Sequence, residues 1–413
     1  MSVIGDYSAV TREIWPQKRI EQRFYQESPV LANCKRTENF AEKFKNITVQ
    51  YGFAQGASHT ASVVLGSSTL GVNGPKYAEF QVPLIEDFHA DTIPDTAVER
   101  GKFNHASLVD NVEKMVEGIV STLAGRASFE AHRGATGRRG VRGSVSSDVL
   151  TLATASDVYN FEVGQQIVAA QTETGVLRDS GDHVTLIAVD PVAGTLTADA
   201  NWSNIASMAD GDSLFVRGDA ANNTGTNLGM WGLGAWNPYG TPAALGGVTR
   251  TANRDRLAGI SLNASALSTK QRALKALANK MFLARKGKGI SRDIKAILHP
   301  NDFDSLTTDL QSAVRYINFD SKAQNVYFEG VVIQTALGAI PVLQDPYAVE
   351  GYGRIIDFAE LEFSTLMKAP RIVENDGLKM LRQSAAFGQE MRGVWKGNLV
   401  TENPITMGVC LLP

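Results

Sequence analysis

Four arginines lie within a ten-residue stretch and form the strongest local charge of the chain: Arg133, Arg138, Arg139 and Arg142. Guanidinium groups bind phosphate and carboxylate oxygens through paired N–H donors. The cluster therefore has two interpretations. In the first, the arginines contact phosphate or an acidic neighbouring molecule. In the second, they belong to a hinge and pair with carboxylates of the same chain. The sequence leaves both open.

Acid–base, nucleophilic and metal-binding residues are dispersed along the chain. The six histidines show no HxH or HExxH spacing of a metal site. Lys35 and Arg36 follow Cys34 and favour its thiolate, but no base lies near it in sequence, and Cys410 lies in an apolar stretch typical of a core. No GxSxG, P-loop or strand-associated GxGxxG motif occurs. We therefore expect no enzyme, and no catalytic, cofactor-binding or metal-binding residues.

Composition and charge narrow the class of protein. The 413 residues are 43% hydrophobic and 20% charged, which is typical of a globular protein of two or three domains. A net charge of -3 argues against a uniformly basic nucleic-acid binder. The two cysteines exclude a disulfide framework and suit a reducing compartment. No signal peptide and no apolar run near the ~18 residues that span a bilayer occurs, so we expect no membrane partner and synthesis in a cytoplasm.

Residues 1–60 are polar and mixed in charge, with single aromatic residues dispersed among them. We expect them to form an arm that gains order by lying on other surfaces. Residues 61–65 and 77–82 have strand patterns, and the stretch 66–75 between them is rich in turn residues. They predict an extended hairpin whose only lysine is Lys76, and we assign 61–104 to this hairpin and its return strands.

The clearest helix follows the hairpin. Apolar residues recur at three- and four-residue spacing from Leu108 to Leu123, and the pattern extends to about Ala131 with Ser107 as the expected N-cap. Residues 132–143 contain four glycines and four arginines, which predicts a loop or hinge. Segment 105–143 is therefore expected to be a long helix followed by a hinge.

Residues 144–219 differ from the rest of the chain in composition. They contain no lysine, two arginines and eleven acidic residues, so this stretch carries -9 and the remainder +6. Short β-type runs separated by Asp- and Gly-rich turns predict a small barrel or sandwich at 149–152, 166–168, 183–189, 195–197 and 213–216. A compact module with its own charge, bounded by glycine-rich stretches, indicates an inserted domain.

The rest of the chain has mixed helix and strand patterns. A helix is expected at 267–284, with Ser268 as cap and Phe282 on its buried face, and another one opens at His299. Strands are expected at 294–298, 326–334, 340–343 and 354–358. The runs 391–395 and 406–412 flank Asn403-Pro404, and we expect them to close the fold as a strand pair.

This order of parts resembles the major capsid protein of tailed bacteriophages, the Hong Kong 97-like family. The segment Leu298-His-Pro-Asn-Asp-Phe-Asp-Ser-Leu resembles the family's strand-to-helix step in the axial domain, and residues 385–408 resemble its last peripheral-domain strands. The resemblance implies an α+β Hong Kong 97-like fold with an inserted β-barrel or sandwich. Its parts are the arm 1–60, hairpin loop 61–104, spine helix and hinge 105–143, insertion 144–219, mainly axial domain 220–360 and peripheral C-terminal strands 361–413.

The resemblance also implies a function. Such proteins self-assemble as hexamers and pentamers into the icosahedral shell around a double-stranded DNA genome. The implied partners are further copies of the chain, portal and scaffold proteins, a decoration protein, and DNA held by weak non-specific contact. The implied location is the virion, after assembly in the host cytoplasm. The candidate contacts to a neighbouring subunit or to phosphate are Arg133, Arg138, Arg139, Arg142 and Lys76.

Two further expectations concern neighbouring subunits. The acidic module 144–219 is expected on the outer surface or at a subunit boundary, where it keeps particles apart or pairs with basic residues of a neighbour. Some members of the family crosslink a hairpin lysine to an asparagine of a neighbouring subunit. Lys76 has no identifiable partner Asn or catalytic Glu in the sequence, so we predict no crosslink.

Other functions are possible for this order of elements. A nanocompartment shell protein has the same fold and encloses enzymes rather than DNA, but such shells as a rule lack an inserted module. An enzyme with an unrecognised site between the α+β body and the β module would need a convergent polar site that the sequence does not reveal. A phage adhesin or tail component is disfavoured by the two strong helices.

Overall fold

The computed structural model describes residues 17–53, 59, 74–94, 105–221, 228–285, 293–310, 316–321, 326–374, 379–382 and 388–413. The chain forms two compact units. The main unit is built from the described residues of Met1–Ser128 and Trp236–Pro413, and the barrel unit from those of Phe129–Ala235. Within these ranges, no helix combines the length and hydropathy needed to cross a membrane.

The hairpin of the main unit is a two-stranded sheet of β2 (Phe44–Gly52) and β3 (Lys76–Pro83). The antiparallel register pairs Ile47 with Phe80, and alternation along both strands places these two residues with Val49 and Val82 on one buried side. The first hairpin strand therefore comes from residues that the sequence assigned to the arm. The predicted strand 61–65 lies outside the described residues.

A six-stranded sheet of the main unit is organised around β20 (Gly388–Thr401). One edge of β20 pairs antiparallel with the return strand β4 (Ile85–Pro94) along the full length of β4. The other edge pairs with three shorter strands in succession, and one of these, β17, pairs in parallel with β1. The shorter strands are β1 (Lys35–Thr37), β17 (Leu361–Thr365), β18 (Arg371–Ile372) and β19 (Met380–Arg382).

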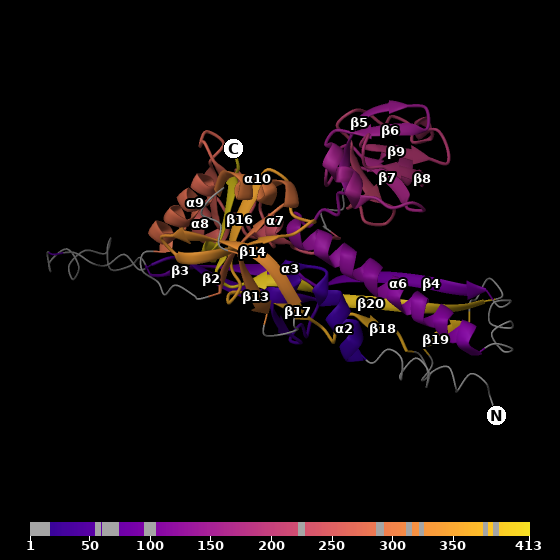
Figure 1. Cartoon of the computed structure of the whole chain (residues 1–413), viewed down its shortest axis with the longest axis horizontal. Helices are drawn as coiled ribbons and strands as arrows, with labels where there is room; N and C mark the ends of the chain where they lie inside the picture. Colours follow the sequence, from indigo (N-terminus) through magenta and orange to yellow (C-terminus); the bar gives the residue numbers. More distant parts are fainter. Residues whose placement is uncertain are drawn as a thin grey trace. The chain divides into compact units, whose positions relative to one another are not determined.

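The helix α6 (His105–His132) lies along β4 and β20 (Figure 1). The predicted helix and its apolar face are confirmed, because Val112, Met115, Val116, Ile119 and Leu123 are buried. The helix begins at His105, so Ser107 lies inside the first turn and is not the N-cap. Gly393 of β20 allows close packing, since a Cβ there would lie 2.3 Å from Cγ2 of Ile119.

Two short helices of the N-terminal segment complete this layer: α2 (Gln17–Gln26) and α3 (Pro29–Asn33). Phe24, Val30 and Leu31 are fully buried. Arg23 of α2 forms an ion pair with Glu117 of α6, with 2.8 Å between the charged atoms. From Gln17 onward the N-terminal segment is therefore packed on its own main unit.

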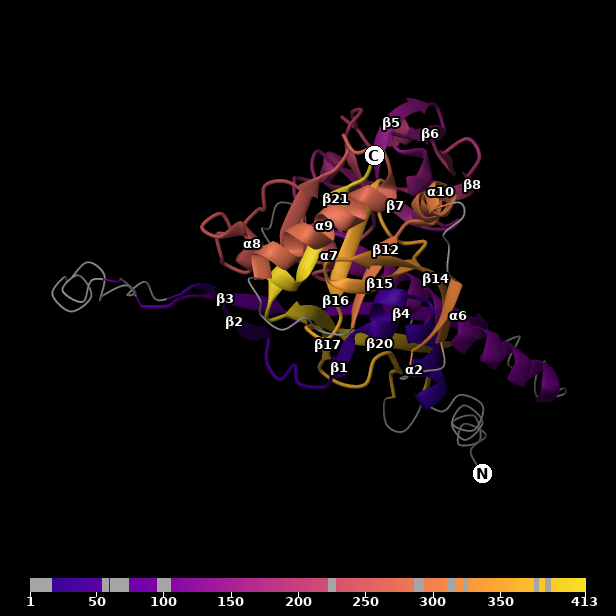
Figure 2. The same ribbon diagram turned by 60° about the vertical axis from the view of Figure 1, so that its left-hand side comes forward.

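The second large sheet of the main unit has seven strands in the order β11-β21-β16-β12-β15-β14-β13. Helix α9 (Lys270–Arg285) lies along it (Figure 2), buries Leu274, Leu277 and Met281, and contacts α10 (Pro300–Leu310). The strands are β11 (Ile260–Asn263), β12 (Ile294–Leu298), β13 (Tyr316–Ser321), β14 (Val326–Thr335), β15 (Gly338–Gln344), β16 (Tyr352–Asp357) and β21 (Met407–Leu411). The predicted strands and helices of this region are confirmed.

Two details of α9 differ from the sequence expectation. The side chain of Thr269 accepts the hydrogen bond from the backbone N–H of Arg272 at 3.3 Å, whereas that of Ser268 accepts one from the Arg272 guanidinium at 2.8 Å. Phe282 is 43% exposed and does not belong to the buried face. The last buried residue of the predicted apolar face is therefore Met281, one residue before its predicted end at Phe282.

The two C-terminal strands belong to different sheets. β20 lies in the six-stranded sheet, whereas β21 lies between β11 and β16 in the seven-stranded sheet. The expectation that these two runs form a closing strand pair is therefore wrong, because β21 pairs with β11 and β16 and not with β20. The connection η4 (Pro404–Thr406) carries the chain from one sheet to the other, and the short helices α7 (Leu233–Trp236) and α8 (Arg254–Leu257) precede β11.

The barrel unit contains a closed six-stranded barrel in the order β10-β5-β6-β9-β8-β7 (Figure 1). Its strands are β5 (Gly140–Ser146), β6 (Val149–Leu152), β7 (Gln166–Ala170), β8 (Val184–Asp190), β9 (Thr195–Ala198) and β10 (Ser213–Val216), with turns η1 (Ala155–Asn160), η2 (Arg178–Gly181) and η3 (Trp202–Asn204). The predicted β-barrel is confirmed. β5 was missed, because residues 132–143 have the composition of a loop.

The segments that lead into and out of the barrel lie side by side, and we call the described residues of 130–137 and 219–234 the neck. A Cβ at Gly232 would lie 2.1 Å from the carbonyl oxygen of Glu130. Gly137 has a φ of +75°, and a Cβ there would lie 2.9 Å from the carbonyl oxygen of Asp219. Glycine is therefore required where the two segments touch backbone to backbone.

Candidate assembly surfaces

The four arginines of the predicted cluster lie in the barrel unit and contact groups of the same unit. The guanidinium groups of Arg133 and Arg139 lie over the ring of Phe129, at 4.7 and 4.4 Å from its centroid. Three arginines form ion pairs with carboxylates: Arg133 with Asp157 at 3.8 Å, Arg138 with Glu173, and Arg142 with Asp210 at 3.1 Å. This geometry favours the interpretation in which the arginines pair within their own chain.

Lys76 lies in the other unit, at the exposed start of β3. Its Cβ lies 3.0 Å from the Cβ position of Gly52, the residue opposite it in β2. Lys76 therefore belongs to a different element and a different unit from the four arginines. It also corrects the statement that Lys76 is the only lysine of the hairpin, because β2 begins at Phe44 and contains Lys45.

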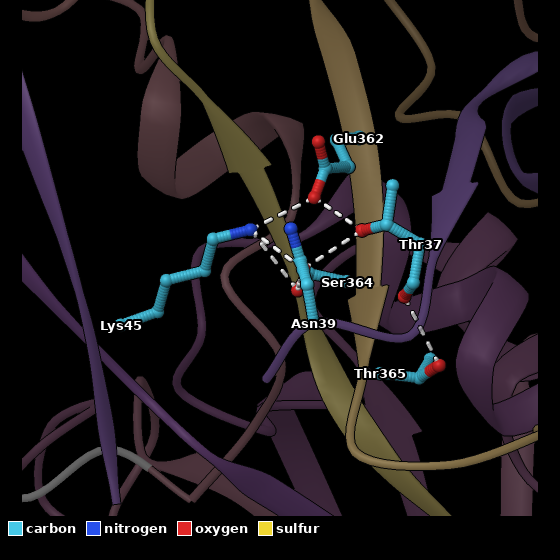
Figure 3. A network of polar contacts seen from close by, with 6 residues as sticks. All are labelled: Thr37, Asn39, Lys45, Glu362, Ser364 and Thr365. Carbon is cyan, nitrogen blue, oxygen red and sulfur yellow. Dashed lines mark hydrogen bonds and ion pairs between the residues drawn. The ribbon is translucent and has the colours of Figure 1, made fainter. Parts of the chain in front are cut away.

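Lys45 is the centre of a polar cluster at the root of the hairpin, drawn in Figure 3. Its Nζ lies 2.8 Å from Oε1 of Glu362, 2.9 Å from Oδ1 of Asn39 and 3.2 Å from Oγ of Ser364. The Ser364 hydroxyl donates to Asn39 at 2.6 Å, and the Thr37 hydroxyl contacts both Asn39 and Glu362. We call Thr37, Asn39, Lys45, Glu362, Ser364 and Thr365 the Lys45 cluster.

The Lys45 cluster is held by charge. Partial burial alone would raise the pKa of Glu362, but hydrogen bonds from Lys45 and Thr37 and the positive charges of Lys45 and Lys35 outweigh it and lower the pKa. Glu362 is therefore ionised at neutral pH. Through these charged and polar contacts, the cluster links β2 to β17 and to Asn39, which follows β1.

A second set of contacts holds the other part of the hairpin root. The ring of Phe80 packs 5.4 Å from that of Trp236, and Asn253 donates to the Tyr51 carbonyl at 3.0 Å. The guanidinium of Arg256 lies 4.1 Å from the ring centroid of Phe53. The hairpin is thus joined to the residues 236–257 as well as to the six-stranded sheet.

Large apolar side chains remain exposed along the hairpin and the strand that follows it. Phe44, Phe53 and Tyr77 of the hairpin are 44%, 45% and 57% exposed, and Phe88 of β4 is 63% exposed. Aromatic rings contribute large apolar area to protein interfaces. These side chains are therefore candidates for contact with another molecule.

The two cysteines, Cys34 and Cys410, both belong to the main unit. Both thiols are buried, and burial raises the pKa of Cys34 and of Cys410. For Cys34 this reverses the expectation from its basic neighbours, since burial outweighs the effect of Arg36. Across the described ranges, no group of three or more His, Cys, Asp or Glu side chains is placed to hold a metal ion.

Comparison with known proteins gives similarity in fold. No protein-family model matches the chain, and no curated sequence matches it. The structure is similar to the capsid asymmetric unit of cyanophage A-1(L), with a TM-score of 0.53 and 12% identity over 93% of this chain and 92% of that one. The capsid of a native GTA particle gives a TM-score of 0.42 at 8% identity, over 95% and 90% of the two chains.

The similarity to the cyanophage capsid subunit extends over nearly the whole of both chains. At 12% identity such a likeness concerns the fold. The chain therefore has the α+β Hong Kong 97-like fold that its order of elements predicts, with a closed six-stranded barrel inserted into it.

Proposed function

We propose that the chain is a structural protein that self-assembles into the icosahedral shell of a tailed phage. The observation that carries the proposal is the fold, which matches that of a cyanophage capsid subunit over 93% of the chain. In this proposal the subunits form hexamers and pentamers, and the shell encloses double-stranded DNA. The location is the virion, after assembly in the host cytoplasm.

The hairpin supports this function physically. A closed shell needs repeated contacts between copies, each modest by itself and summed over many neighbours. A two-stranded hairpin with three exposed aromatic rings offers a contact surface of this kind. We propose it as the principal contact to a neighbouring copy.

Two of the five predicted contact residues have exposed side chains. Lys76 is exposed, and the Arg138 side chain is 37% exposed. We propose Lys76 and Arg138 as contacts to a neighbouring subunit. Arg133, Arg139 and Arg142 are more deeply buried, and we propose for them a role within the barrel unit.

The remaining proposed partners follow from the same function. Portal and scaffold proteins would direct assembly, and a decoration protein would bind the finished shell. With a net charge of -3, the chain would hold packaged DNA only by weak, non-specific contact. The acidic surface of the inserted domain is proposed to face outward or to lie at a subunit boundary.

The test is expression of the full chain, followed by sedimentation and electron microscopy. Uniform hollow shells support the proposal, and nuclease-resistant DNA within particles from infected cells supports the phage capsid over a nanocompartment. Shells that carry a specific protein cargo and no DNA would favour the nanocompartment. A discrete small oligomer that stays small with scaffold present would contradict a shell function.

A variant pair sharpens this test. Tyr77→Ser removes an exposed ring from the hairpin, and Tyr159→Ser removes a ring that is 72% exposed on the barrel unit. We expect Tyr77→Ser to reduce the yield of shells about tenfold, since a buried interface aromatic contributes about 1–2 kcal/mol. Tyr159→Ser should leave the yield unchanged. Quantitative sedimentation measures both, and equal yields would contradict the proposed hairpin contact.

A further inference from the structure

The direction of the hairpin depends on contacts at its root. β2 and β3 have no third strand among the described residues. A two-stranded sheet is only marginally stable alone, so side-chain contacts must fix where it points. The residues 236–257 contact it through Phe80 and Tyr51. The six-stranded sheet contacts it through Lys45 and through Asn398, which donates to the Pro83 carbonyl at 2.8 Å.

Lys45 is suited to this task by its position and its partners. Lys45, Ile47 and Val49 are each two residues apart along β2, so their side chains point to the same, buried side of the strand. The Lys45 side chain is 21% exposed, and its Nζ contacts acceptors on Asn39, Glu362 and Ser364. Removal of this one ammonium leaves a carboxylate, an amide oxygen and a hydroxyl without their common donor.

Lys396, a lysine of the six-stranded sheet, provides a matched comparison. Lys396 of β20 also forms a 2.8 Å ion pair, with Glu86 of β4, and its side chain is 23% exposed. The distance and the exposure of the lysine therefore match those of the Lys45–Glu362 pair, whereas the Glu86 carboxylate is more exposed, at 38% against 20% for Glu362. Lys396 joins two strands of one sheet, whereas Lys45 joins the hairpin to a different sheet.

We propose that Lys45 is a positioning residue that fixes the direction of the hairpin on the main unit. The inference deepens the proposed function, because the direction of the hairpin determines where its exposed rings meet a neighbouring copy. Lys45 itself does not contact that copy. It acts through the Lys45 cluster, and its loss should disturb the geometry of assembly more than the stability of the subunit.

The test compares Lys45→Met, Lys45→Arg and Lys396→Met in the full chain. Hydrogen exchange of the unassembled protein is measured by mass spectrometry. We expect Lys45→Met to speed exchange in 44–52 and 76–83 about tenfold, the effect of losing one charge-assisted contact, with no change in β16. Lys45→Arg should restore most of the protection, and Lys396→Met should match the natural chain. Electron microscopy of assembled material should show a broader range of shell diameters for Lys45→Met only.

The outcomes separate the two proposals. Equal exchange in the hairpin for Lys45→Met and Lys396→Met would overturn the positioning role. If Lys45→Met does not fold, Glu362→Gln removes the negative charge opposite Lys45 without changing the size of the side chain. Hairpin exchange in Glu362→Gln is then compared with that in Lys396→Met. If the natural chain forms no shells even with scaffold present, the proposed function fails, while faster hairpin exchange in Lys45→Met still supports the positioning role.

Discussion

The carboxylate of Glu362 is 20% exposed and accepts hydrogen bonds from Lys45 and Thr37, which lower its pKa despite partial burial. A group whose pKa is lower in the folded than in the unfolded state stabilises the fold above the unfolded value. This contribution is lost as the pH falls through the folded value. We therefore expect Glu362→Gln to lower the free energy of unfolding by about 1 kcal/mol near neutral pH.

The check is thermal unfolding of both proteins from about pH 7 to about pH 3, across the titration range of a carboxylate. The difference between them should shrink as the pH falls through this range. Glu86→Gln, at the exposed pair with Lys396, is the control and should change stability less at every pH. A difference for Glu362→Gln that stays constant over this range would contradict the assigned pH dependence.

Asp212 belongs to a more deeply buried ion pair in the barrel unit. Its side chain is 3% exposed and receives two hydrogen bonds from Arg178, at 2.9 and 2.8 Å. Arg178→Ala leaves this carboxylate buried without its cation, so we expect a loss of about 3 kcal/mol. Arg217→Ala removes an exposed arginine of the same unit and should cost far less. Chemical denaturation of the two variants measures both values.

At the scale of elements, the packing of α6 on β20 is limited by Gly393. A Cβ there would lie 2.3 Å from Cγ2 of Ile119 and 2.9 Å from Cδ1 of Leu123, so helix and strand would have to separate. We expect Gly393→Ala to destabilise the main unit by about 2–3 kcal/mol. Calorimetry should show the loss as a lower unfolding temperature.

Gly118, on α6 itself, is the matched control. No atom lies within 4 Å of its Cβ position, and alanine favours a helix over glycine by about 1 kcal/mol. Gly118→Ala should therefore raise the unfolding temperature of the main unit. A rise for both variants would show that α6 does not pack tightly on β20.

Local sequence patterns predicted most helices and strands, but they do not reveal which distant segments come together. The spacing of Val112, Met115, Ile119 and Leu123 identified α6, because an apolar face repeats along one helix. β2 was missed, although Ile47 and Val49 alternate with polar residues, because the surrounding sixty residues are polar on average. For β21 the pattern predicted a strand but contains no information on which sheet the strand joins.

The Lys45 cluster could not be predicted from the sequence. Lys45 and Glu362 are 317 residues apart, and neither belongs to a motif. Only the return of β17 to β1 places the carboxylate beside the lysine. The arginines were identified as a group from their spacing, but the choice between internal and external partners required the positions of Asp157, Glu173 and Asp210.

At the scale of the whole molecule, each unit has a hydrophobic core of its own. Leu277, Met281 and Val342 belong to the core of the main unit, and Leu150, Trp202 and Leu214 to that of the barrel unit. Two separate cores predict two unfolding transitions in the unassembled chain.

Calorimetry of the full chain and of residues 129–235 alone tests this prediction. The isolated segment should reproduce one transition, and Arg178→Ala should lower that transition only. Gly393→Ala should lower the other one. A single transition that both substitutions shift together would contradict independent units.

The neck has a consequence for engineering. Because the backbone at Gly137 touches that at Asp219, the chain leaves the barrel almost where it entered. A visiting domain whose own ends lie a few ångströms apart meets the same geometric condition and needs no added linker. The segment between Gly137 and Asp219 is therefore a site where an antigen or a fluorescent domain can replace the barrel.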